Sequence, residues 1–438
     1  MNLFFKKLTG NLMSTGKMED YIAQMEADIA RYRAVEKSAE LAEYKKLKET
    51  VSSLAFRQKK QNLTETKYKT TKYYLTLQEL NGLEKNKDLQ LYMQVRDSQQ
   101  LKEYLAFRAG DEYVKLSDKK LVRQSPDLKN MLRFEKSKAY KAYLEYRLST
   151  TPDRYEALRK QVSEEEFQRE NAFWANPQRW LTTPEHVQEV RFEQLSKLPD
   201  LKFFFSQDVK KIEEMESYKL TFGEEFQWVR LAESKWKPGF CYRNKNLLKQ
   251  HSFANEKQAN NGGKNAGSIN GTFTILTKHE AVTAPAWDAK KGFINKEYEY
   301  TSDVLNTADS FRQEGGLFMI KLRCFGNIHH AAWLGAESRL PMVTLFHYNG
   351  KQIVVGNITT DGFTGDKIGG ISPSQYYIYS LRWTRTELVW YVNNVEVYRM
   401  QRSVPREELY LALSSFISEK QRPQEGKFEV DWIRVYKQ

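Results

Sequence analysis

Apolar residues recur every three to four positions in the first half of the chain and every second position in the second half. Within residues 18–62, the positions at helical spacing form one apolar face, with charged residues elsewhere: Tyr21, Met25, Ile29 and Tyr32. A coiled coil and a bundle helix would both give this pattern. Residues 1–85 are therefore predicted to form long helices.

Residues 86–217 contain a repeat of about 39 residues. The pairs Asp88-Leu89 and Asp127-Leu128 are 39 positions apart (127 − 88), and LKEYLAFR (101–108) matches YKAYLEYR (140–147) at the same offset. A third copy is found around Phe167 to Trp180, and a shorter fourth copy begins at Asp200. Each copy is expected to form two short α-helices, with a capping residue near the break between them: Ser98, Ser137 or Asn176. Such repeats stack, so we expect their aromatic residues to be core and the region to be a spacer or assembly arm.

After residue 217 the pattern changes to short alternating runs separated by glycine and asparagine. The clearest runs are GGLFMIKLR (315–323), YYIYSLRW (376–383), ELVWYVNNVEVYRM (387–400) and FEVDWIRVYK (428–437). Asn393-Asn394 is a hairpin signal, because asparagine tolerates the left-handed conformation of tight turns. The prediction is an α+β multidomain chain, in which an all-α helical repeat region precedes an antiparallel β-sandwich of jelly-roll type in residues 218–438.

The order of these strands resembles glycoside hydrolase family 16, the laminarinase-like branch of the concanavalin A-like lectin/glucanase fold. The matching segments begin at KLTFGEEF (219–226) and SINGTFTI (268–275), and they end at WYVNN (390–394) and VDWIRVY (430–436). The resemblance covers about half of the chain and does not include residues 1–217. Since one fold hosts many functions, it leaves the activity to be argued from the site.

The resemblance also implies where catalytic acids would lie. In the family, a bulged strand carries Glu-x-Asp-x-x-Glu, and a retaining enzyme needs two carboxyl groups about 5 Å apart. The matching positions here are Pro341, Val343 and Phe346, and a shift of one residue places Thr344 in the middle. None carries a carboxylate, and Pro341 also removes a ladder donor from the strand. The expectation is a pseudoenzyme with no catalytic residues in this motif.

Two other groups of residues could supply catalytic or metal-binding side chains. Glu337, Asp361 and Asp366 lie in neighbouring loops, so a hydrolase with displaced acids stays an alternative. His329 and His330 are adjacent, and adjacent strand residues face opposite sides, so they are not expected to share a metal ion. No metal and no cofactor is predicted.

A cleft without acids can still bind a ligand, and the resemblance implies that aromatic side chains in the cleft walls stack on sugar rings. The predicted ligand-binding residues are His330, Trp333, Thr344 and Tyr348. Trp333 could equally be ordinary sandwich core. Trp383, Trp390 and Trp432 fall inside alternating runs and are predicted to be core.

Charge and composition narrow the partners only slightly. A net charge of +13 favours acidic partners. Because no nucleic-acid-binding motif accompanies this charge, nucleic-acid binding is not supported beyond the net charge. Whether Cys241 and Cys324 pair stays open. The patch Leu3-Phe4-Phe5 is too short for a signal peptide, and no run approaches a membrane span.

The resulting expectation is a bacterial protein that is cytoplasmic or particle-associated. Its function is predicted to be a non-catalytic carbohydrate-binding or partner-binding sandwich carried on a helical repeat arm, which could form a homo-oligomer. A structural or assembly protein, such as a filament, surface-layer or phage-particle component, is the first alternative. An active glycosidase is the second.

Overall fold

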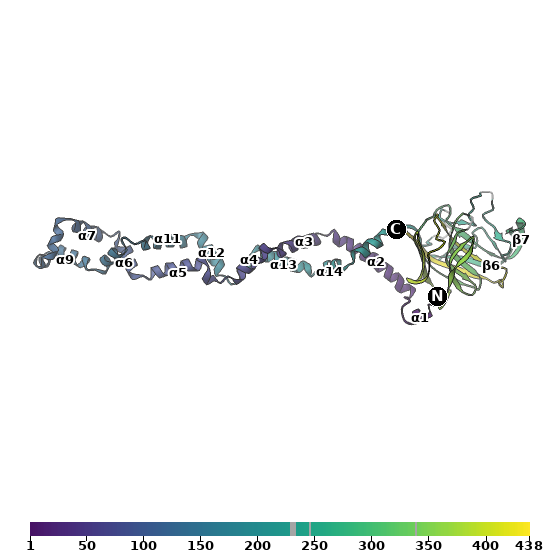
Figure 1. The fold of residues 1–438 in the computed structure, drawn as a ribbon, viewed down its shortest axis with the longest axis horizontal. Helices are drawn as coiled ribbons and strands as arrows, with labels where there is room; N and C mark the ends of the chain where they lie inside the picture. Colours follow the sequence, from purple (N-terminus) through teal and green to yellow (C-terminus); the bar gives the residue numbers. More distant parts are fainter. Residues whose placement is uncertain (228–233, 245–246, 338–339) are drawn as a thin grey trace. The chain divides into compact units, whose positions relative to one another are not determined.

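The computed structural model describes residues 1–227, 234–244, 247–337 and 340–438. These residues form two compact units, one made of Met1–Arg33 with Ser206–Gln438 and the other of Ala34–Phe205. The first contains the β-sandwich and the second is all-helical, which confirms the predicted fold class (Figure 1). Residues 1–33, which include a short helix and most of a long one, group with the sandwich and not with the repeats.

The helical unit is built from short helices that run out and then back. Its outgoing half contains α3 (Ala39–Ser52), α4 (Leu54–Glu65), η1 (Tyr68–Thr70), α5 (Lys72–Glu84), α6 (Lys87–Val95) and α7 (Gln99–Ala109). The chain reverses through η2 (Asp111–Ser117) and α8 (Lys119–Gln124). The returning half contains α9 (Pro126–Glu135), α10 (Lys138–Tyr146), α11 (Thr151–Ser163), α12 (Glu165–Ala175), η3 (Arg179–Thr182), α13 (Pro184–Ser196) and α14 (Pro199–Ser206).

The two halves pack side by side, α3 on α13, α5 on α11 and α6 on α10 (Figure 1). Equivalent residues of the first two repeat copies meet in one buried cluster, Val95 and Leu101 from one copy with Phe134 and Tyr140 from the other. The aromatic residues are thus core, as predicted. The repeats, however, face each other across a hairpin and do not stack in successive layers, because the chain reverses between them.

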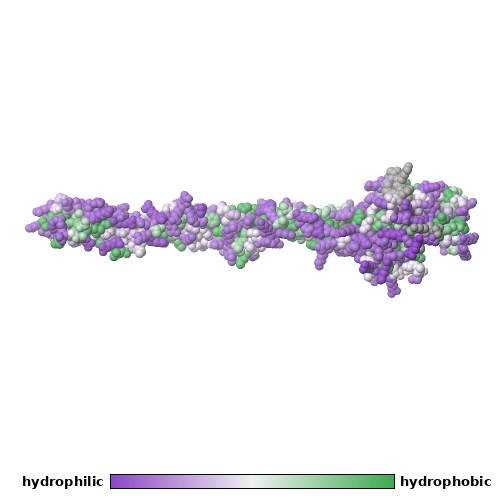
Figure 2. Space-filling view, turned by 90° about the horizontal axis from the view of Figure 1, so that it is seen from above, coloured by the Kyte–Doolittle hydropathy of each residue, from purple (hydrophilic) through white to green (hydrophobic). Residues whose placement is uncertain are grey.

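Short polar side chains cap the N-termini of several helices of this unit. The Oγ of Ser98 accepts a hydrogen bond from the backbone N–H of Leu101 (3.2 Å), and the Oγ of Ser137 does the same for Tyr140 (3.0 Å), so both are N-caps as predicted. Asn176 instead follows the last residue of α12, and its Oδ1 accepts from the N–H of Gln178. On the face shown in Figure 2 the unit is mostly hydrophilic, with hydrophobic residues scattered along it.

The sandwich consists of two sheets, antiparallel except where β3 pairs with β6 and β4 with β7. One sheet has the order β13 (Gly362–Ile368), β12 (Ile353–Thr359), β11 (Met342–Asn349), β10 (His329–Gly335), β17 (Tyr410–Phe416), β8 (Val304–Asn306) and β2 (Lys237–Pro238). The other has the order β16 (Val395–Met400), β15 (Leu388–Val392), β14 (Tyr377–Trp383), β9 (Gly316–Phe325), β18 (Gly426–Lys437), β6 (Thr272–Asp288), β7 (Gly292–Ser302) and β4 (Gln258–Asn260). Strand β1 (Lys219–Glu224) adds to β18, and β3 (Ser252–Phe253) and β5 (Ala266–Ile269) add to β6.

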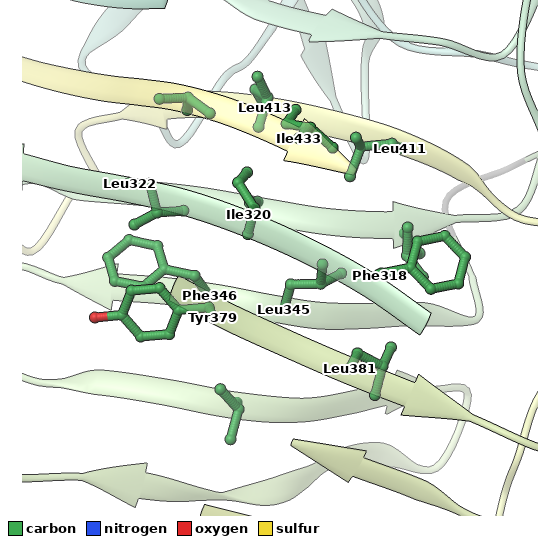
Figure 3. Packing of buried hydrophobic residues seen from close by; sticks show 14 of the residues in the cluster. Phe318, Ile320, Leu322, Leu345, Phe346, Tyr379, Leu381, Leu411, Leu413 and Ile433 are labelled. Atoms are coloured by element: carbon green, nitrogen blue, oxygen red, sulfur yellow. The ribbon is translucent and has the colours of Figure 1, made fainter. Parts of the chain in front are cut away.

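The main core lies between the two sheets and draws side chains from both. Figure 3 shows Phe318, Ile320 and Leu322 of β9 in the same cluster as Leu345 and Phe346 of β11. Trp383 and Trp390 belong to this core, as predicted. Trp432 is also buried, but it packs with Met18 on the other face of its sheet, in a cluster to which the helix α2 (Thr15–Glu36) contributes.

The first residues of the chain are part of the sandwich. Leu3 is fully buried in the main core, and its N–H donates to the carbonyl of Gly369 (2.8 Å) just before the short helix α1 (Phe4–Leu8). Further along, the Oε1 of Glu19 accepts from the Nζ of Lys321 (2.7 Å) and from the Nε1 of Trp432 (3.1 Å). Arg33 pairs with Glu216 of α15 (Val209–Ser217).

Two further predictions concern the whole chain. No helix among the described residues is long and apolar enough to cross a membrane. Cys241 and Cys324 are both buried free thiols, and they lie in different hydrophobic clusters.

Candidate functional site

A β-bulge in β11 decides which side chains of this strand face the core. On one side β11 pairs with β10 so that Ala332 is opposite Phe346 and Trp333 is opposite Thr344, which leaves Leu345 without a counterpart. The pairing with β12 is irregular at the same place. Because a bulge inserts one extra residue, Leu345 and Phe346 both turn into the core, and the alternation resumes one residue later.

The side chains of β11 that face away from the core lie one residue later than the positions that the resemblance implied, and the bulge moves the third of them to His347. Val343 and Phe346 are fully buried in the core between the sheets, with the Phe346 ring 4.8 Å from that of Tyr379 (Figure 3). The opposite face of β11 carries Met342, Thr344 and His347, which keep the spacing of Glu-x-Asp-x-x-Glu. None of these three is a carboxylic acid. Thr344, the polar residue among apolar neighbours, is the sequence signal for this register.

These three side chains line a cavity of about 320 Å³ on the face of the seven-stranded sheet that points away from the core. Its apolar walls are Phe240, Phe253, Val304, Ala331, Trp333, Met342 and Phe416. Its polar lining is Asn255, Glu256, Asn260, Thr344, His347, Ser414, Ser415 and Ser418. The volume is at the lower end of the range for small-ligand sites, which combine apolar walls with a few polar groups in this way.

Two of the four predicted ligand-binding residues meet in this cavity. Trp333 is mostly buried beside it, in a cluster separate from the main core, and its Nε1 donates to the Oγ of Ser414 (3.3 Å). Its ring meets that of Tyr410 edge-on at 5.7 Å. Thr344 lies directly opposite Trp333 on the neighbouring strand. Its Oγ1 is buried and has no hydrogen-bond partner among the described residues.

The other two predicted residues lie outside the cavity. His330 is fully buried, its Nε2 donates to the carbonyl of Phe325 (3.0 Å), and its Nδ1 accepts from Ser415 Oγ (2.8 Å). Burial lowers the pKa of His330 to about 3, so the ring is neutral at pH 7. Tyr348 belongs to the main core, and its hydroxyl is 3.4 Å from Asn327 Oδ1. In the alternation of their strands, both residues fall on the side that faces the core.

A histidine pair that the sequence did not reveal borders the cavity. The Nδ1 of His329 lies 2.7 Å from the Nε2 of His347, and the ring of Phe416 stacks on His329 with centroids 4.3 Å apart. Burial lowers the pKa of His329 to about 4 and that of His347 to about 3. Both rings are therefore neutral at pH 7, and one donates an N–H to the other. His329 and His347 are diagonal neighbours on two strands, so sequence spacing gives no sign of them.

The acids needed for glycoside hydrolysis are not gathered here. Glu256 is the single carboxylate among the described residues that line the cavity, and its Oε2 accepts from the N–H of Phe253 and from Gln258 Nε2 (3.1 Å each). Hydrolysis by the usual route needs a second carboxylate across the scissile bond. Among the described lining residues, this second carboxylate is missing.

The three acids proposed as replacements have other partners. Glu337 is held by Arg312 (3.0 Å) and Arg243 (3.3 Å), and these hydrogen bonds lower the pKa of its carboxyl. Asp366 pairs with the amino group of Met1 at 2.8 Å, which lowers its pKa in the same way. Asp361 lies in the exposed turn between β12 and β13. None of the three lines the cavity.

Across the described ranges of the chain, no group of three or more histidine, cysteine, aspartate or glutamate side chains could hold an ion. His329 and His330 do face opposite sides of β10, one toward His347 and one into the core.

No protein-family model and no curated protein matches the chain. Among solved structures, it is similar to the catalytic domain of an endo-1,3-β-glucanase (laminarinase) from Thermotoga petrophila, with 18% identity over 50% of this chain and 98% of that chain and a TM-score of 0.40. It is also similar to SCLam, a non-specific endo-β-1,3(4)-glucanase from family GH16 (23% identity, 50% and 91% covered, TM-score 0.41). A third is LamAcat from Zobellia galactanivorans (19% identity, 51% and 99% covered, TM-score 0.39). Activity has to be argued from the residues of this chain.

Proposed function

We propose that the β-sandwich binds a saccharide in the cavity beside Trp333 and Thr344 and does not hydrolyse it. The observation that carries the proposal is the hydroxyl of Thr344, which is buried, lines the cavity and has no hydrogen-bond partner among the described residues. Leaving a buried hydroxyl unsatisfied costs about 1–3 kcal/mol. A ligand hydroxyl in the cavity would remove that cost.

The remaining lining supports a hydroxyl-rich ligand. Amide and hydroxyl groups from Asn255, Asn260, Ser414 and Ser418 can both donate and accept, as sugar hydroxyls do. Trp333 supplies an apolar surface next to them, and the neutral pair of His329 and His347 adds no charge at pH 7. An apolar wall with a few polar groups, here mostly uncharged with Glu256 as the one carboxylate among the described lining residues, is the composition of small-molecule sites in general.

Isothermal titration calorimetry of the full chain against a panel of neutral and acidic oligosaccharides tests this proposal. We expect binding, and Thr344→Val should weaken it by about tenfold while leaving the melting temperature unchanged or higher, because the lost hydroxyl had no partner to lose.

Thr307→Val is the matched control. The Oγ1 of Thr307 donates to the carbonyl of Phe311 (3.0 Å) and accepts from the N–H of Leu411 (3.0 Å), so this variant should lower the melting temperature and leave the affinity alone. Release of reducing ends would overturn the non-catalytic part. Absence of any saccharide binding at millimolar concentration would overturn the whole proposal.

A further inference from the structure

An aromatic surface continues from the cavity onto the hairpin of β6 and β7. Phe240 and Phe253 line the cavity, and their rings lie 5.1 and 5.4 Å from that of His251. His251 contacts Phe293 of β7 at 5.3 Å, and Phe293 meets Trp287 of β6 at 4.8 Å. Each step of this run is a direct ring contact, but His251 is buried, so the run is an aromatic cluster beneath the surface. The half-buried Phe253, which lines the cavity and lies opposite Trp287, is the residue that joins the cavity to the hairpin end.

The strand pairing explains why these rings lie on one face. Strand β3 pairs with β6 so that Phe253 is opposite Trp287, and β6 pairs with β7 so that Trp287 is opposite Phe293. Residues directly opposite each other in a sheet point to the same side. Trp287 and Phe293 of the hairpin end and Phe253 of β3 thus lie on one face of this sheet.

The opposite face of the hairpin is packed, which holds the aromatic face in place. Ala286 of β6 is buried in a small cluster with Ala259 and Tyr298. The Nζ of Lys296 donates to the backbone carbonyls of Ala254 (2.8 Å) and Glu256 (2.7 Å), and this ties β7 to the segment that lines the cavity. Figure 1 shows this hairpin at the edge of the sandwich.

The aromatic face is partly open to solvent. Trp287 is 36% exposed, and Phe293 and Phe253 are half-buried. An exposed group of aromatic side chains that is continuous with a ligand cavity is typical of a binding surface.

Lysine side chains lie at the far end of this surface. Lys290 and Lys291, in the turn after Trp287, are exposed. The carboxylate of Asp288 in the same turn accepts from the backbone N–H groups of these two lysines at 2.8 Å each, which fixes the turn. Lys249, which precedes β3, is exposed as well.

We infer that the β6–β7 hairpin extends the cavity into a site for a polysaccharide chain, whose sugar rings lie on Phe293 and Trp287 and whose acidic groups meet Lys290 and Lys291. The inference rests on the proposed function of the cavity and adds the length and charge of the ligand. A single-stranded nucleic acid also favours aromatic faces and lysines. The polysaccharide is favoured because the run ends in a cavity whose polar lining is mostly hydroxyl and amide groups, which pair with sugar hydroxyls. The one carboxylate among the described lining residues, Glu256, already accepts two hydrogen bonds.

The test uses the full chain and oligosaccharides of hyaluronan, polygalacturonate and κ-carrageenan, from disaccharide to decasaccharide, in calorimetry. Affinity should rise with length for at least one polymer, until the chain reaches the hairpin. Trp287→Ala should reduce the affinity for the decasaccharide by about tenfold and that for the disaccharide by less than about twofold. Trp287→Phe should retain most of the affinity, and Phe363→Ala, which changes an exposed ring on β13, should have no effect.

The charge arm uses Lys290→Gln with Lys291→Gln, compared with Lys351→Gln in the exposed turn after β11. The double variant should weaken binding of the acidic decasaccharide and leave its carboxyl-reduced or desulfated form unaffected. Disaccharide binding without any gain from length, or an unchanged affinity in Trp287→Ala, would overturn the hairpin site and leave the cavity proposal standing. Failure of every saccharide would overturn both. Tighter binding of a thymidine decanucleotide, weakened by Trp287→Ala, would assign the surface to nucleic acid.

Discussion

The helical unit and the sandwich bury their apolar side chains in different ways. The helical unit has several small clusters, such as Leu80, Leu89, Tyr155 and Leu158 around α5, α6 and α11, each separate from the next. The sandwich has one large cluster that takes residues from both sheets and from the first residues of the chain. Units whose parts contact only their neighbours lose structure locally, whereas a shared core couples distant strands. The same kind of substitution should therefore have local effects in one unit and global effects in the other.

The largest expected difference between the two units is the loss of stability in acid. Burial holds the pKa values of His329, His330 and His347 at about 4, 3 and 3, below the ordinary value of 6.5. The folded sandwich thus binds fewer protons than the unfolded chain between these limits, and the stability present above pH 6.5 is lost as the pH falls. Together, the three histidines should lower the free energy of unfolding by about 4 kcal/mol for each pH unit below pH 6.

One buried carboxyl works in the opposite direction. Burial raises the pKa of Asp303 to about 6 from 3.8, although three backbone N–H groups, of Asn261, Gly263 and Asn265, donate to it. The stability that Asp303 contributes is fully present below pH 3.8 and is lost as the pH rises through 6. As the pH falls from 6 toward 3.8, this carboxyl therefore restores about 1 kcal/mol per pH unit of the stability that the histidines lose. The net loss should be about 3 kcal/mol per pH unit between pH 6 and 4.5.

Amide hydrogen exchange followed by region measures this contrast. Protection in the sandwich should fall steeply between pH 6 and 4.5 after correction for the intrinsic exchange rate. The helical unit, whose single histidine is His186, serves as the internal reference. Equal losses in both units would contradict the assignment to the buried histidines.

Removal of a core ring should destabilise the whole sandwich. Phe346 is fully buried against Tyr379 and Phe428. Phe346→Ala leaves a cavity and should lower the free energy of unfolding by about 3–5 kcal/mol, measured by denaturant titration with near-ultraviolet circular dichroism. Protection should fall in both sheets. A loss confined to β11 and its neighbours would show that the core is less coupled than its contacts indicate.

An equivalent deletion in the helical unit should stay local. Leu158 is 1% exposed in the cluster of α5, α6 and α11. Leu158→Ala should cost about 2–5 kcal/mol by the same cavity mechanism. Exchange protection should fall in these three helices and remain in α3 and α13, which pack around Leu41 and Leu195. Loss of protection along the entire helical unit would show that its clusters are coupled as strongly as the core of the sandwich.

The smallest effect should come from a helix cap. Ser98→Ala removes the acceptor for the N–H of Leu101 at the start of α7 and should cost about 1 kcal/mol, seen as faster exchange in the first turn of that helix. Ser117→Ala is the matched control, because the Oγ of the exposed Ser117, the last residue of η2, donates to the carbonyl of Val114 and accepts no helix N–H. If the two variants behave alike, capping does not stabilise these short helices.

The sequence by itself determined the local features of this protein. Helical spacing, the caps at Ser98 and Ser137, and the alternating runs of the second half each depend on neighbours within a few residues, so they can be read directly from the chain. The burial of Trp383 and Trp390 follows from the same alternation. In these places the sequence-based expectations agree with the structure.

Only the tertiary structure decided what faces the cavity. The bulge at Leu345 depends on the register of β11 against both β10 and β12, and it turns Phe346 inward and His347 outward. The pairing of the consecutive strands β10 and β11 brings His329 to His347, and β3, from an earlier part of the chain, places Phe253 in the cavity wall. A shift of one residue reverses every side chain of a strand, so the identity of a site on a sheet is set by pairing, which sequence spacing alone does not fix.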